Sequence, residues 1–162
     1  MTTDESTLSW YQVPAETKRL LQAAAAAWED TASSEALMRQ AIAQTQTDLN
    51  VLVAAYRYFF YKNNNSMALQ MAHQVLEQVQ IVEQLPTEWE QLKPILICRK
   101  EEPNIRLYLS AYAASGLVLA RLGNIEAATV ITARVSEIDD RKEFGASTVL
   151  DVLTRSPEED DE

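Results

Sequence analysis

The stretch that decides the fold is residues 109–140, which read LSAYAASGLVLARLGNIEAATVITARVSEIDD. Apolar residues recur three or four positions apart on both sides of Gly123-Asn124, a pattern typical of two amphipathic helices joined by a tight turn. Gly116 in the first helix and Ala128 in the second are small, so two helices can approach closely there. The stretch therefore predicts an antiparallel helix pair that crosses at these two residues.

Similar pairs are expected earlier in the chain. Ala36 and Ala68 lie a few residues into second helices, as Ala128 does, and they are 32 positions apart. The small residues of the corresponding first helices are Ala23-Ala24, Ala54-Ala55 and Ser115-Gly116. We therefore predict three helix pairs, at about 16–48, 49–82 and 108–140.

This arrangement resembles the tetratricopeptide repeat (TPR), whose period is about 34 residues. The resemblance implies an all-α fold, a TPR-like right-handed helical superhelix of three helix pairs plus a C-terminal capping helix at 141–154. It also implies a groove lined by the first helix of each pair. The register of the second repeat stays open by one residue, because Ala54-Ala55-Tyr56 stands where a small pair is expected.

The helical domain is expected at 14–155, beginning after Pro14 near Ala15 because proline suits a first helical turn. Residues 1–13 are predicted to be a flexible arm, and the acidic segment 156–162 a disordered tail. Three prolines punctuate the insert at 83–107, so it should hold no long helix and only a short one around Trp89.

Side chains that accept hydrogen bonds from backbone N–H groups should begin several helices. Ser34, Asp48 and Ser66 stand before apolar runs and are predicted N-caps. Asn63-Asn64-Asn65 is predicted to be a turn, because asparagine tolerates the left-handed conformation. We expect a last helix from Arg141 to Thr154.

Composition excludes several classes of partner. The 162 residues carry a net charge of −10 and show no basic stripe, so neither nucleic acid nor an anionic membrane is an expected partner. The N-terminal residues do not resemble a signal peptide, and Cys98 is the only cysteine. These features predict a cytoplasmic protein.

Residues for catalysis are sparse. The chain has one histidine, His73, and three scattered glycines, and Cys98 follows an apolar run and is expected to be partly buried and inert. No catalytic, cofactor-binding or metal-binding set emerges, so we predict that the protein is not an enzyme and needs no cofactor. A small cytosolic enzyme with an unrecognised site is the alternative of a different class.

Aromatic and basic side chains are concentrated in Tyr56-Arg57-Tyr58-Phe59-Phe60-Tyr61-Lys62. One interpretation is a middle helix buried on both sides. The other, which follows from the TPR resemblance, is that part of this helix lines the partner-binding groove. Arginine and tyrosine are common binding anchors. The predicted groove residues are Arg57, Tyr61, Arg106, Tyr108 and Arg121, and the predicted partner is another protein with an acidic or amphipathic segment. The Trp89 insert is the alternative binding element.

Two narrower resemblances bear on function. Residues 55–62, 85–89, 106–109, 119–123 and 144–153 resemble small bacterial TPR proteins encoded beside nitrogen-fixation genes, which implies an adaptor or chaperone accessory to nitrogen fixation. In size, acidity and repeat number the chain is also similar to type III secretion translocator chaperones, the alternative adaptor function. Neither resemblance identifies the partner or the oligomeric state.

Overall fold

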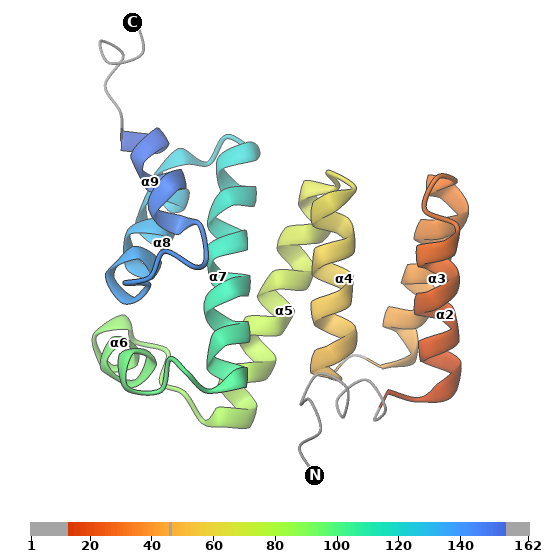
Figure 1. Cartoon of the computed structure of the whole chain (residues 1–162), viewed down its shortest axis with the longest axis horizontal. Helices are drawn as coiled ribbons and strands as arrows, with labels where there is room; N and C mark the ends of the chain where they lie inside the picture. Colours follow the sequence, from red (N-terminus) through yellow and green to blue (C-terminus); the bar gives the residue numbers. More distant parts are fainter. Residues whose placement is uncertain (1–12, 46, 155–162) are drawn as a thin grey trace, which may run out of the picture.

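The computed structural model describes residues 13–45 and 47–154, and every regular element in these residues is a helix (Figure 1). The predicted all-α class is thus confirmed for the described residues. The predicted arm and acidic tail lie outside them, apart from Val13, which is buried in the core. The helices are α2 (Ala15–Ala26), α3 (Thr31–Gln44), α4 (Leu49–Tyr61), α5 (Asn65–Glu83), α6 (Trp89–Cys98), α7 (Pro103–Arg121), α8 (Ile125–Ile138) and α9 (Ala146–Thr154).

Helices that follow one another in the chain pack as antiparallel pairs, α2 with α3, α4 with α5, and α7 with α8 (Figure 1). The pairs stand in a row in chain order, because α3 touches α4 and α5 packs along α7. Helix α9 lies against α8 at the end of the row. A large apolar core runs through the array, from Val13 before α2 to Ile138 of α8, and a smaller cluster of Ala113, Val135 and Ala146 lies between α7, α8 and α9.

Helix α6 is longer than the sequence predicts, and it raises the count of substantial helices above the expected seven. It extends to Cys98 although Pro94 lies inside it. Proline removes one backbone donor, which leaves the carbonyl of Glu90 four residues earlier without its helical partner. Both Glu90 and Pro94 are exposed, so water can satisfy that carbonyl and the helix continues.

Helix α9 is shorter than expected, because the predicted start at Arg141 falls in a loop. The Asp139 carboxylate accepts hydrogen bonds from the backbone N–H groups of Glu143 and Phe144, both at 2.8 Å. Lys142 and Gly145 adopt positive φ angles of 56° and 76°, which no α-helix contains. The helix therefore begins only at Ala146.

Side-chain caps begin four of the described helices, including α8, where Asn124 accepts a hydrogen bond from Ala127 N, although only one of the predicted caps is correct. Asp48 accepts hydrogen bonds from Asn50 N and Val51 N at the start of α4, as predicted. Asp30 caps α3 in place of Ser34, and Asn64 caps α5 in place of Ser66. The predicted turn is confirmed at Asn63, which has a φ of 60°.

The small residues at helix crossings correct one prediction. Ala68 and Ala128 are buried, but Ala36 is exposed and the buried residue in its pair is Ser34. Ser34 and Ala68 are 34 positions apart. In the third pair, a Cβ atom on Gly116 would lie 3.0 Å from Thr132 Cγ2 and 3.2 Å from Ile131 Cγ2. The expected close approach of α7 and α8 at Gly116 is therefore present.

Candidate functional site

The candidate binding surface begins on α4, which has one open face. Asp48 fixes the start of this helix, and the faces that carry Ala55, Tyr56 and Phe59 are buried against neighbouring helices. Arg57 and Tyr61 are one turn apart and both exposed, with the Tyr61 side chain 70% exposed. The sequence left two interpretations of this segment, and each describes one side of the helix.

Helix α7 brings a second arginine to this face. The Arg121 guanidinium lies over the Phe60 ring, with Cζ 4.5 Å from the ring centroid. Phe60 and Tyr61 meet edge to face at 5.5 Å. Arg57 lies 5.9 Å from the Tyr56 ring, and the Tyr56 hydroxyl is 3.1 Å from Ser110 Oγ of α7. We call Arg57, Phe60, Tyr61 and Arg121 the Arg57–Arg121 surface.

The charges of this surface are unusual for the molecule. Most arginines in the described part of the chain are paired with carboxylates, as Arg99 is with Glu83 and Glu102. Arg57 and Arg121 contact aromatic rings and have no carboxylate partner among the described residues. In a chain with 24 acidic residues and 14 lysines and arginines, two such neighbouring cations form a local positive exception.

Two of the predicted groove residues lie elsewhere. Arg106, near the other end of α7, forms an ion pair with Glu143 at 2.7 Å and lies 5.4 Å from the Phe144 ring. The Arg106 guanidinium holds the pKa of the Glu143 carboxyl below its ordinary value. Arg106 therefore ties α7 to the loop before α9 and does not join the Arg57–Arg121 surface.

Tyr108 is part of the core and does not line a surface, since only 4% of it is exposed. Burial, with a contribution from neighbouring Tyr112, raises the pKa of its phenol to about 12. The sequence pattern missed Phe60 as the platform for Arg121. Phe60 lies three residues after Arg57 and next to Tyr61, and this spacing could have indicated that it lies beside both on the helix surface.

The Trp89 insert is tied to the last helix pair. Arg134 of α8 lies 5.0 Å from the Trp89 ring and donates a hydrogen bond to the Tyr112 hydroxyl at 3.2 Å. Trp89 and Tyr112 are themselves 6.4 Å apart. The tryptophan is half-buried, so it offers less free ring surface than Tyr61 does.

The residues considered for chemistry stand apart from one another. His73 on α5 and Cys98 on α6 are both exposed, which corrects the expectation that Cys98 is partly buried. Among the described residues, no three His, Cys, Asp or Glu side chains converge as a metal site would require. None of the helices in this part of the chain is long and apolar enough to span a membrane.

Comparison with known proteins identifies a relative encoded near a nitrogen-fixation gene. An uncharacterized 19.8 kDa protein encoded in the nifW 5' region of Azotobacter chroococcum mcd 1 is 35% identical over 128 residues, which cover 77% of this chain and 71% of the relative. The chain belongs to the family of this Azotobacter protein. The predicted resemblance to proteins encoded beside nitrogen-fixation genes is supported by that relative. No family model matches the chain, so the TPR assignment gains no support, and no solved structure matches it either.

Proposed function

We propose that this protein is a non-catalytic cytoplasmic adaptor or chaperone with a TPR-like right-handed superhelix, and that it holds a segment of another protein. The observation that carries the proposal is the Arg57–Arg121 surface, where two arginines without carboxylate partners lie beside the half-buried Phe60 ring and the exposed Tyr61 ring. Such a surface suits an acidic or amphipathic segment, because carboxylates form charge-assisted hydrogen bonds with guanidinium groups. Aromatic rings beside the charges add apolar contact area.

The family supports the proposal of a role accessory to nitrogen fixation. The Azotobacter relative is named for its place beside nifW. We extend that setting to this chain and infer that the bound partner is a component of nitrogenase or of its assembly. The unpaired guanidinium groups of Arg57 and Arg121 beside the exposed Tyr61 ring support the holding of a protein segment.

The test is capture of the partner by the full chain from extracts of the native host grown under nitrogen-fixing conditions. The double variant Arg57→Ala/Arg121→Ala should lose the partner. Each buried charge-assisted contact contributes about 1.5–3 kcal/mol, and each contact at a solvent-exposed rim about 0–1 kcal/mol. The affinity of the double variant for the partner should therefore be tenfold or more below that of wild type if the bound partner buries either arginine.

The matched control is Arg19→Ala/Arg141→Ala, which removes two exposed arginines that have carboxylate partners. It changes the net charge equally, so it should retain the partner. Circular dichroism should show the same helix content for all three proteins. Equal capture by wild type and Arg57→Ala/Arg121→Ala would rule out this surface as the binding site. Capture only of proteins unrelated to nitrogen fixation would rule out the proposed role in that process.

A further inference from the structure

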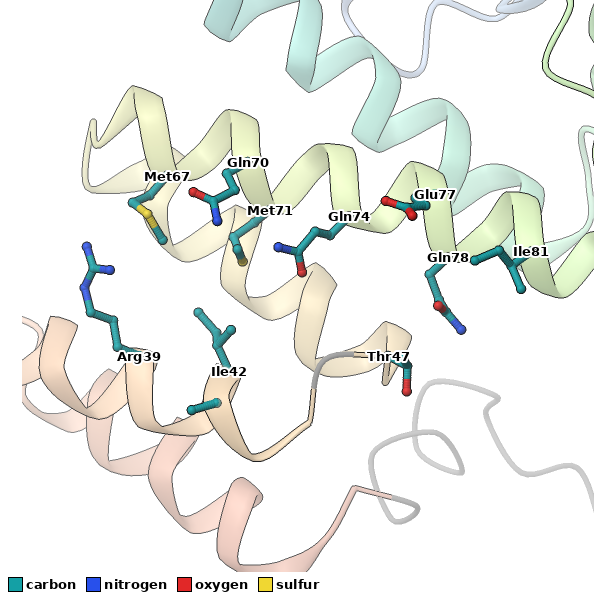
Figure 2. A pocket seen from close by; sticks show the side chains of 11 residues that line it. Arg39, Ile42, Thr47, Met67, Gln70, Met71, Gln74, Glu77, Gln78 and Ile81 are labelled. Atoms are coloured by element: carbon teal, nitrogen blue, oxygen red, sulfur yellow. The ribbon is translucent and has the colours of Figure 1, made fainter.

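A second surface lies between α3 and α5 and shares no residue with the Arg57–Arg121 surface. It is a groove of about 580 Å³, a volume within the range of ligand sites (Figure 2). Its apolar side chains include Ile42, Met67 and Ile81, and Ile81 is 63% exposed. Methionine side chains adapt readily to different apolar partners. The groove thus offers apolar surface that a bound segment would remove from water.

Glutamines form a row along one wall. Gln70, Gln74 and Gln78 follow one another at intervals of four residues on α5, and all three line the groove. Figure 2 shows Met67 and Gln70 near Arg39 at one end, and Gln78 and Ile81 at the other. Each side-chain amide carries both hydrogen-bond donors and an acceptor. The row therefore offers paired donors and acceptors beside an apolar surface.

The spacing of this row matches an extended polypeptide. Four residues of an α-helix rise about 6 Å, and two residues of an extended chain span about 6.6 Å. Successive glutamines therefore face the backbone of alternate residues of an extended segment. A bound helix would form few hydrogen bonds with these glutamines, because most of its backbone groups are already hydrogen-bonded to one another.

The groove also carries opposite charges towards its two ends. Arg39 lies beside Met67 and Gln70, where it forms an ion pair with Glu35 at 2.7 Å that leaves other guanidinium donors available. Glu77 lies one helical turn before Ile81 and has no cationic partner among the described residues. A segment with an acidic residue near Arg39 and a basic residue near Glu77 would complement both.

We propose that the groove between α3 and α5 binds an extended segment of a partner protein. Apolar side chains at alternate positions of that segment contact Ile42, Met67 and Ile81. Its backbone exchanges hydrogen bonds with the glutamine row. An acidic residue lies at its Arg39 end and a basic residue at its Glu77 end.

The experiment uses a random library of eight-residue peptides displayed on phage and selected on the immobilised full chain. The test variant is Gln70→Met/Gln74→Met/Gln78→Met, which keeps side-chain length and removes the amides. The control, Gln22→Met/Gln40→Met/Gln91→Met, alters three exposed glutamines that do not line the groove. Circular dichroism and thermal melts check that both variants fold.

We expect enriched peptides to alternate apolar and polar residues, with opposite charges at their two ends. A synthetic peptide of the consensus sequence should bind the test variant about tenfold or more weakly than wild type, as expected for several lost hydrogen bonds. It should bind the control, and Arg57→Ala/Arg121→Ala, as it binds wild type. In Arg39→Glu/Glu77→Arg the enriched peptides should carry their charges in the reversed order.

Three results would overturn the proposal. One is that no peptide is enriched on wild type relative to the test variant. Another is enrichment of peptides with apolar residues three and four apart, which would identify a helical occupant. The third is consensus binding that survives the glutamine changes but is lost in Arg57→Ala/Arg121→Ala, which would assign the peptides to the other surface.

Discussion

The junctions on the two sides of the middle helix pair are built differently. Helix α5 packs closely along α7, whereas α3 touches α4 only sparingly. The first junction joins helices rich in fully buried apolar residues, such as Val75 and Val79 on α5 and Ile105 and Leu109 on α7. The second leaves the groove between α3 and α5 open.

The sparse junction is held near one end of α4 by polar and aromatic contacts. The Tyr58 hydroxyl donates a hydrogen bond to Ser34 Oγ at 2.8 Å, and Ser34 in turn donates to the Ala24 carbonyl at 2.7 Å. Trp28 meets Tyr58 edge to face at 5.5 Å, and Lys62 Nζ lies 3.9 Å from the Trp28 ring centroid. Lys62 also donates a hydrogen bond to the Trp28 carbonyl.

The difference between the α5–α7 junction and the α3–α4 junction bears on where a partner can bind. Close packing along a whole helix makes a continuous interface, while the sparser contact of α3 with α4 leaves the groove beside it open to bind something else. Local stability commonly differs between regions of one chain, and binding elements are commonly drawn from the less stable regions. We expect α2 and α3 to open more readily than α7 and α8, and the following predictions test that expectation.

The largest effect should come from the α5–α7 junction. Leu109→Ala removes a side chain that is 1% exposed, and loss of burial plus the resulting cavity should cost about 2–5 kcal/mol. Hydrogen exchange should accelerate in α4, α5, α7 and α8. The matched change Leu20→Ala, at a residue 2% exposed in α2, should accelerate exchange mainly in α2 and α3. Equal acceleration of all helices by both variants would contradict the difference between the junctions.

Alkaline pH should weaken the same junction through Tyr108. Burial raises the pKa of this phenol to about 12 in the folded state, from an ordinary value of 10.0. Below pH 10 both states keep the proton. Above it the unfolded state ionises first, so stability falls between about pH 10 and pH 12, by about 2–3 kcal/mol in total. Denaturant titrations should show that the free energy of unfolding falls less steeply with rising pH for Tyr108→Phe than for wild type. An equally steep fall in both proteins would show that ionisation of Tyr108 is not coupled to unfolding.

The helical class and the pairing could be predicted from sequence because they depend on local periodicity. Gly123-Asn124 and Asp48 carry strong turn and cap signals, and the structure uses both. Asp30 caps α3 four residues before the predicted Ser34, because the intervening Thr31, Ala32 and Ser33 are small or polar and carry no apolar helical pattern that would place them in the helix. The sequence could not identify Ser34 as a crossing residue, because the hydrogen-bond partners of its hydroxyl, Ala24 and Tyr58, are 10 and 24 positions away.

The candidate site could be predicted only in part, because charge and aromatic content do not report tertiary partners. Arg57, Tyr61 and Arg121 lie on one surface, but the same reasoning included Arg106 and Tyr108. Arg106 pairs with Glu143, which is 37 positions away, and Tyr108 faces the core. The α3–α5 groove had no sequence signal, since it arises from sparse packing between helices.

A smaller effect is expected at the crossing of α7 and α8. Gly116→Leu adds a side chain where a Cβ alone would lie 3.0 Å from Thr132 and 3.2 Å from Ile131, so overpacking should cost about 1–3 kcal/mol. Thermal melting should report a lowered midpoint. A suitable control is Ala26→Leu at an exposed position of α2, which should leave the midpoint nearly unchanged. A midpoint for Gly116→Leu equal to wild type would mean that the two helices separate at little cost.

The smallest effect tests the sparse junction itself. Tyr58→Phe removes the hydroxyl that donates to Ser34 and keeps the ring against Trp28. Ser34 still donates to the Ala24 carbonyl, so no buried donor is orphaned and the cost should be only about 0.5–1.5 kcal/mol. Because the contacts across this junction are few, that small loss should appear as faster hydrogen exchange in α2 and α3, with α7 and α8 unchanged. Tyr112→Phe is the matched control, since it removes a hydroxyl that accepts from Arg134 in the C-terminal half. If Tyr58→Phe instead accelerated exchange uniformly along the chain, the two junctions would form one cooperative unit and the N-terminal pair would not open separately.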